Sequence, residues 1–116
     1  MAERKQGTVF TIQGETMGRG DDALGAKILG SFFRTLGTLD EKPDAIVFYN
    51  AAVKHLAAGS PHLEALSALH AAGVDLLACV TCLEHFALTE KLAVGTVSNM
   101  REILQRTMGA AKVVGI

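Results

Sequence analysis

The chain has 116 residues, of which 49% are hydrophobic and 20% charged, and its net charge at pH 7 is -1. This length suits one domain, because domains cluster at about 100–150 residues, and the apolar content can fill a core without a disulfide or metal. The charge balance leaves no basic face for phosphate contacts, and the 5% of aromatic residues include no tryptophan for base stacking. We therefore expect no binding to nucleic acid.

Residues 1–6 are polar and lack the apolar core of a signal peptide. The sequence also contains no apolar run of the roughly 20 residues that cross a bilayer. Together these features predict a cytoplasmic protein without membrane contact. In that compartment its two cysteines are more often reduced, catalytic or metal-binding than paired in a structural disulfide.

Residues 7–13 read as the first strand, and a glycine-rich loop over residues 14–21 follows it. Asp21 or Asp22 then caps a helix that ends near Leu36, with Gly37 as a stop signal. Apolar residues recur through this segment at helical spacing: Leu24, Ile28, Leu29, Phe32, Phe33 and Leu36. The pattern predicts a helix with one face on the core.

The second strand is predicted over residues 45–49, a continuous apolar run typical of a strand buried in a parallel sheet. Residues 51–58 are rich in alanine and predict a short helix or turn. Ser60 followed by Pro61 predicts the start of a helix, with a serine cap and proline at the first helical position. That helix is expected to end at Gly73.

The third strand is predicted over residues 74–78, directly before the cysteine loop. Residues 83–88 predict a short helix and residues 94–97 a short fourth strand. Ser98 or Asn99 then caps a helix in which Met100, Ile103, Leu104, Thr107 and Met108 follow the 3.6-residue period. Residues 111–116 complete the pattern as the last strand.

Alternating strands and helices predict one α/β domain over residues 1–116, with a mainly parallel sheet covered on both faces. Right-handed crossovers place every strand-to-helix loop at the same edge of such a sheet. We therefore expect the loops at residues 14–21, 50–54 and 79–82 to converge.

Cys79 and Cys82 carry the strongest chemical signal, because they lie where a buried strand passes into a helix. A thiol on a first helical turn meets unpaired backbone N–H groups and the positive end of the helix dipole, both of which favour the nucleophilic thiolate. Cys82 holds this position, and His85 lies one turn further on. Cys79 ends an apolar strand and is expected in the core, with a resolving role open to it. The alternative for Cys82 is a small buried hydrophobe.

Two other site types are weaker. Cys79, Cys82 and His85 have the spacing C-x2-C-x2-H, but structural zinc takes four ligands and no second cysteine pair is present. Residues 18–23 fit a loose dinucleotide fingerprint, yet acidic residues at the helix start would repel phosphate, so a turn with a helix cap is the better interpretation. After the second strand, Lys54 and His55 are placed to stabilise an anionic sulfur species, although such side chains are more often simply solvated. We expect neither a metal nor a bound cofactor.

Several blocks together resemble the C-terminal domain of YedF-type proteins, which belong to the DsrE-like group of sulfurtransferase-related proteins and are linked to selenium metabolism. They cover nearly the whole chain: residues 16–25, 47–50, 59–61, 79–83 and 91–100. The resemblance implies a three-layer α/β/α sandwich around a five-stranded, mainly parallel sheet. It also implies a homo-oligomer, as a trimer or hexamer.

The resemblance implies a sulfur or selenium carrier, with a persulfide on Cys82, His85 lowering the pKa of that thiol, and Cys79 as a resolving thiol. The TusA-like domain of YedF-type proteins, with its Cys-Pro-x-Pro motif, is not among these residues, so the relay would use a separate donor or acceptor protein. Val80 stands where the family usually has glycine, which implies a less open loop at Cys79. A non-catalytic oligomeric interaction or regulatory module of the same fold is the alternative function.

Overall fold

The computed structural model describes residues 7–116, which form a sheet of five strands with helices on both faces. The strands are β1 (Thr8–Ile12), β2 (Ala45–Phe48), β3 (Asp75–Cys79), β4 (Thr96–Ser98) and β5 (Lys112–Gly115). They lie in the order β4-β3-β2-β1-β5, and every neighbouring pair is parallel. The predicted five-stranded α/β sheet is confirmed, and it is parallel throughout.

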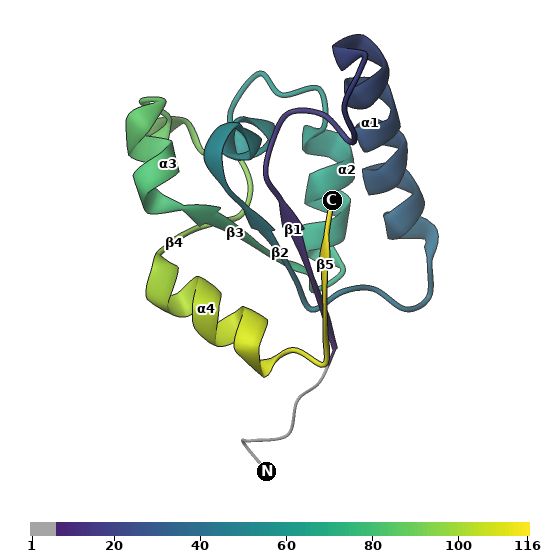
Figure 1. The fold of residues 1–116 in the computed structure, drawn as a ribbon, viewed down its shortest axis with the longest axis vertical. Coiled ribbons are helices and arrows are strands. Elements are labelled where there is room, and N and C mark those ends of the chain that lie inside the picture. Colours follow the sequence, from purple (N-terminus) through teal and green to yellow (C-terminus); the bar gives the residue numbers. More distant parts are fainter. Residues whose placement is uncertain (1–6) are drawn as a thin grey trace.

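Four α-helices connect the strands: α1 (Asp22–Thr38), α2 (Leu63–Ala71), α3 (Val80–His85) and α4 (Met100–Gly109). Two 3-10 segments, η1 (Asn50–Leu56) and η2 (Thr89–Lys91), complete the connections. The chain steps from β1 to β4 in one direction and then returns across the sheet to β5. Because crossovers are right-handed, this return places α4 on the face opposite α1 and α2, as Figure 1 shows.

Alternation along the strands divides the core into two unequal parts. Ile46 and Phe48 of β2 point to the face covered by α1 and α2, where they join the larger apolar cluster. Ala45 and Val47 point to the other face and join a smaller cluster with Ile103 of α4. One face is therefore covered by α1 and α2 together with η1 and α3, whose buried residues join the larger cluster, and the other face is covered by α4.

The predicted helix caps are largely confirmed, with shifts of a few residues. Asp21 accepts a hydrogen bond from the Leu24 backbone N–H at 2.8 Å, and Asn99 accepts one from the Glu102 N–H at 2.9 Å. The predicted start of α2 at Ser60 was two to three residues early. The Ser60 hydroxyl instead accepts from the His62 N–H at 3.1 Å and forms a turn before the helix.

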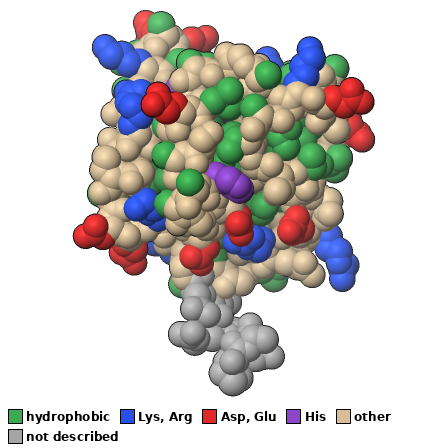
Figure 2. All heavy atoms as spheres, turned by 180° about the vertical axis from the view of Figure 1, so that it is seen from behind, with side chains coloured by type: hydrophobic (Ala, Val, Ile, Leu, Met, Phe, Trp, Pro, Cys, Tyr) green, Lys and Arg blue, Asp and Glu red, His purple; other side chains and the backbone are tan. Residues whose placement is uncertain are grey.

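Gly37 does not stop α1, which continues to Thr38, because a glycine weakens a helix without breaking it. Within residues 7–116, no helix is long and apolar enough to cross a membrane. In Figure 2, which views the molecule from behind, acidic and basic side chains are interspersed around the margin of the visible face, and apolar ones gather nearer its middle.

Candidate functional site

The two cysteines lie at the carboxyl end of β3, where the predicted loops converge. Cys79 is the last residue of β3 and is only 5% exposed, whereas Cys82 is the third residue of α3 and is partly buried. Both are free thiols, and they lie close enough for the charge of Cys79 to affect the pKa of Cys82. Cys82 packs against the clusters on both faces of the sheet, so it lies at the end of the sheet between the two helical layers.

The backbone of Asn50 points directly at the Cys82 sulfur, with a distance of 3.0 Å between the amide nitrogen and Sγ. This orientation depends on a left-handed backbone conformation at Asn50, where φ is 51°. Asparagine tolerates that conformation better than most residues, and here its own Oδ1 accepts a hydrogen bond from the Ala51 N–H at 2.9 Å. This donor was not predicted from the sequence, although an asparagine directly after a buried strand is a recognisable turn signal.

The expected lowering of the Cys82 thiol pKa was wrong. Burial raises the pKa of Cys82, the Asn50 N–H opposes that shift, and the hydrogen bond and charge of Cys79 add to it. α3 has only six residues, so its aligned peptide dipoles are few. The position of Cys82 on a first helical turn predicted only the stabilisation of its thiolate by backbone N–H groups. Desolvation of the thiolate was not predicted, because it depends on what the rest of the chain packs around the sulfur.

His85 is exposed at the last turn of α3, and its ring lies edge-on to Phe86 with 4.9 Å between the centroids. No hydrogen bond within the described residues joins it to Cys82, and its charge is not among the causes that shift the Cys82 pKa. The geometry therefore gives His85 a surface position beside the thiols rather than a bond to them.

Tyr49 is a neighbour of both thiols that no sequence motif predicted. It packs against the smaller cluster, which contains Cys79 and against which Cys82 also packs. Burial raises the pKa of the Tyr49 phenol, and the nearby charges of Cys79 and Cys82 raise it further. A phenol that stays protonated beside the thiols is a hydrogen-bond donor available to an anionic sulfur atom.

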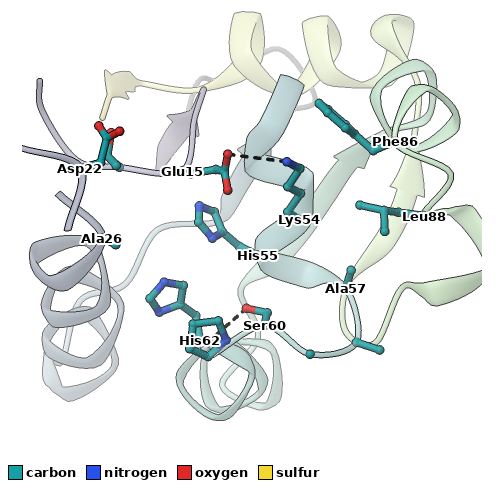
Figure 3. A pocket seen from close by; sticks show the side chains of 14 residues that line it. Glu15, Asp22, Ala26, Lys54, His55, Ala57, Ser60, His62, Phe86 and Leu88 are labelled. Atoms are coloured by element: carbon teal, nitrogen blue, oxygen red, sulfur yellow. Dashed lines mark hydrogen bonds and ion pairs between the residues drawn. The ribbon is translucent and has the colours of Figure 1, made fainter.

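A cleft of about 920 Å³ opens beside this thiol site, on the side of the sheet covered by α1 and α2 (Figure 3). Its lining contains neither cysteine. The lining residues come from the loop after β1, the start of α1, the segment from η1 to α2, and the end of α3: Glu15, Thr16, Asp22, Ala26, Lys54, His55, Ala57, Ala58, Gly59, Ser60, Pro61, His62, Phe86 and Leu88. Phe86 directly follows α3, and its backbone N–H donates to the Cys82 carbonyl at 3.2 Å, so the end of α3 connects the cleft to the thiol site.

His55 and His62 form the polar floor of the cleft, with 5.1 Å between their ring centroids. His55 is only 6% exposed, and its Nε2 lies 3.0 Å from the Gly14 carbonyl oxygen. Burial lowers the pKa of His55, outweighing the opposite effects of the Gly14 bond and the Glu15 charge. Burial likewise lowers the pKa of His62, with the charges of His55 and Arg34 acting in the same direction.

Lys54 and Glu15 form the charged rim of the cleft. The Lys54 Nζ lies 3.6 Å from the Glu15 carboxylate and 4.7 Å from the centroid of the Phe86 ring. Both side chains are substantially exposed, at 42% and 57%. Solvated side chains were the favoured interpretation of Lys54 and His55. Lys54 is indeed exposed, whereas His55 is buried, and both line the cleft.

The two alternative sites acquire no supporting geometry. Among residues 7–116, no three His, Cys, Asp or Glu side chains are arranged to hold a metal ion, so the C-x2-C-x2-H spacing does not become a ligand set. In the glycine-rich loop, Asp21 serves as the cap of α1, and the Thr16 hydroxyl donates to the Gly18 carbonyl at 3.1 Å. These contacts match the predicted turn and helix cap.

The fold is shared with solved structures from bacteria and an archaeon. MTH1491 from Methanobacterium thermoautotrophicum, a protein of unknown function, matches with a TM-score of 0.69 and 25% identity over 97% of this chain and 100% of its own. YchN from E. coli matches with a TM-score of 0.67 and 21% identity over 96% and 99%. BT1422 from Bacteroides thetaiotaomicron, also of unknown function, matches with a TM-score of 0.59 and 18% identity over 93% and 94%.

No curated protein matches the sequence. The model of the DsrE/DsrF-like family does match, over residues 16–114, which include most of the glycine-rich loop, both cysteines and every cleft-lining residue except Glu15. The chain therefore belongs to the DsrE/DsrF-like family.

Proposed function

We propose that this protein is a sulfur or selenium carrier that holds the transferred atom as a persulfide or its selenium analogue on Cys82. The family is associated with sulfur relay. The observation that carries the assignment to Cys82 is the Asn50 backbone N–H, which points at Sγ from 3.0 Å. A fixed N–H donor at a sulfur atom stabilises negative charge there, and negative charge develops on that atom whenever a persulfide bond to it is broken.

Loading is a thiol–persulfide exchange. The Cys82 thiolate attacks the terminal sulfur of a donor persulfide, a new S–S bond forms, and the donor cysteine leaves as a thiolate. Delivery reverses these roles: an acceptor thiolate takes the terminal sulfur, and Cys82 leaves as the thiolate under the Asn50 N–H. No electrons are gained or lost overall, and no bound cofactor is needed.

Burial keeps the resting Cys82 thiol protonated at neutral pH, because its pKa is raised. The proton must therefore leave when a donor docks. Cys79, 5% exposed and close enough for its charge to affect the pKa of Cys82, is placed to act second. Its thiolate can attack Sγ of the persulfide and release hydrosulfide, leaving a Cys79–Cys82 disulfide. We assign His85, exposed beside the thiols, to contact with the incoming partner.

We infer that the partners are separate donor and acceptor proteins, of which a TusA-like protein is one candidate, and further copies of this chain. The α4 face carries an exposed stripe in which Met100, Leu104 and Met108 recur every fourth residue, with exposed fractions of 50%, 49% and 73%. An apolar stripe on the only helix that covers this face suits a homo-oligomer. Sedimentation should show a trimer or hexamer that Met108→Lys dissociates and that the exposed Lys27→Met leaves intact.

Persulfide loading is tested by measuring intact mass after the reduced protein is incubated with a cysteine desulfurase and cysteine. We expect a gain of one sulfur atom in the wild type and in Cys79→Ser, and none in Cys82→Ser. A gain that survives in Cys82→Ser would overturn the assignment.

The alternative function is a non-catalytic interaction module, favoured by the same exposed stripe on α4. No mass gain in the wild type, with both thiols shown to be free, would establish that alternative over the carrier.

A further inference from the structure

We propose that the cleft beside the thiols binds the amino-acid end of a small zwitterionic thiol, and that this thiol accepts the sulfur carried by Cys82. The binding part stands on the geometry of the cleft alone; the acceptor part rests on the proposed function. A cleft of about 920 Å³ is in the size range of small-molecule sites, and none of its lining residues has a role in the thiol chemistry described above.

His55 supplies a hydrogen-bond acceptor to this cleft. The Gly14 carbonyl can only accept a hydrogen bond, so the His55 Nε2 must carry the proton and Nδ1 must hold a lone pair. Within residues 7–116 no hydrogen bond reaches Nδ1, yet no buried side-chain nitrogen or oxygen there lacks a partner. Nδ1 is therefore not fully buried, and it is free to accept a hydrogen bond from an ammonium or hydroxyl group of a ligand in the cleft that His55 lines.

The rim supplies both signs of charge. Glu15 and Asp22 are carboxylates, and Lys54 is the cation. The 3.6 Å separation between Lys54 and Glu15 exceeds a normal hydrogen bond, so both groups keep bonding capacity for a ligand. A simple anion would meet two carboxylates, and a simple cation would meet Lys54. A zwitterion satisfies both, with its ammonium toward Glu15 and the His55 Nδ1 and its carboxylate toward Lys54.

Phe86 and Leu88 form an apolar wall at the α3 side of the cleft. The Phe86 backbone N–H donates to the Cys82 carbonyl at 3.2 Å, so a ligand that extends along Phe86 reaches the end of the helix that carries Cys82. In the transfer step, the ligand thiolate attacks the terminal sulfur of the Cys82 persulfide. One S–S bond breaks and one forms, the terminal sulfur keeps its proton, and Cys82 leaves as a thiolate beside the Asn50 N–H.

Binding is tested separately from transfer by using Cys82→Ser, which cannot carry a persulfide. Glutathione and free cysteine are titrated into this variant and followed by amide chemical shifts, with propionate and ethylamine as single-charge controls. We expect one of the two thiols to bind at about 1 mM or tighter and to shift cleft residues, and neither control to do so. Which thiol binds more tightly shows whether the natural ligand is the amino acid itself or a peptide that carries its head group.

Two cleft variants and one control locate the site. Glu15→Gln removes the anion, and His55→Gln keeps a donor for Gly14 while removing the ring acceptor. Each should weaken binding about tenfold or more, the loss expected for a charge-assisted hydrogen bond. Lys27→Gln, an exposed change on α1 outside the cleft, should have no effect.

Absence of shifts at about 10 mM ligand, equal binding by propionate or ethylamine, or unchanged affinity in both cleft variants would each overturn the binding site. The persulfide-loaded wild type is then mixed with the ligand that binds, and formation of the ligand persulfide is followed by mass. Binding without transfer would overturn the acceptor role. If Cys82 cannot be loaded at all, the carrier function fails, and the binding result still decides the site.

Discussion

Cys82 and His55 lie at the same edge of the sheet, and burial keeps both uncharged by moving their pKa values in opposite directions. The pKa of Cys82 is raised and that of His55 is lowered, with desolvation as the largest cause in each case. Their hydrogen bonds differ: Cys82 receives the Asn50 N–H, whereas His55 donates to the Gly14 carbonyl. The thiol site is therefore built to receive negative charge, and the histidine cleft is built to accept a proton donor.

The largest effect on the cleft is expected from truncating a core side chain beneath it. Phe33 is fully buried, and its ring centroid lies 6.1 Å from that of His55 and 5.5 Å from that of His62. Phe33→Ala should cost about 3–5 kcal/mol of unfolding free energy, through lost burial and the cavity left behind. Urea denaturation measures the loss.

Phe32→Ala is the matched control, because Phe32 is a partly buried neighbour on the same helix. It should cost clearly less than Phe33→Ala. A larger loss in Phe32→Ala would show that the α1 core is organised differently from the packing described here.

A narrower change disturbs the loop that carries the Gly14 carbonyl. A Cβ at Gly25 would lie 2.5 Å from the Thr16 Cβ, so Gly25→Ala must push that loop away from α1. We expect about 1–3 kcal/mol of destabilisation, while the alkylation rate of Cys82 stays unchanged. Gly37→Ala is the control in the same helix, because its nearest new contact is an ordinary 4.0 Å to Leu69. Equal stability of the two variants would contradict the close approach of the loop.

The free energy of unfolding should depend on pH through both His55 and Cys82. The pKa of His55 in the folded protein lies below the unfolded value of about 6.5, so the unfolded chain takes up a proton first as the pH falls. The free energy of unfolding therefore decreases through and below about pH 6.5, and His62 acts in the same direction. The pKa of Cys82 is raised in the folded protein, so the unfolded chain loses its proton first as the pH rises. The free energy of unfolding therefore decreases above about pH 8.5, and Tyr49 adds to that loss above about pH 10.

Urea denaturation across this range separates the two contributions. His55→Gln should flatten the acid side and Cys82→Ser the alkaline side. An acid side that keeps its full slope in His55→Gln would locate the responsible group elsewhere.

The smallest expected effect concerns the coupling between the thiols. The hydrogen bond and charge of Cys79 both raise the Cys82 pKa, so Cys79→Ala should lower it. The rate of alkylation by iodoacetamide against pH reports that value, and in this variant Cys82 is the only thiol. The wild-type rate at Cys82 is read from its peptide by mass spectrometry. An unchanged or higher apparent pKa in Cys79→Ala would show that the two thiols are not coupled.

Most of the architecture was predictable because it depends on local patterns. Continuous apolar runs identified β2 and β3, helical spacing identified α1 and α4, and Asp21 and Asn99 act as caps where the sequence placed them. The start of α2 was missed because Ser60 makes a turn with His62, and a serine before a proline looks the same in both cases.

The sequence by itself determined the alternation of strands and helices, the parallel sheet, and the position of both cysteines at its carboxyl edge, because hydrophobic period and capping are properties of neighbouring residues. Only the tertiary structure decided which groups surround the thiol and which face the cleft. The Asn50 N–H reaches Cys82 across 32 positions in the chain, and His55 meets Gly14 across 41. The direction of the Cys82 pKa shift is decided at the same level, because desolvation depends on everything packed around the sulfur and no local motif encodes it.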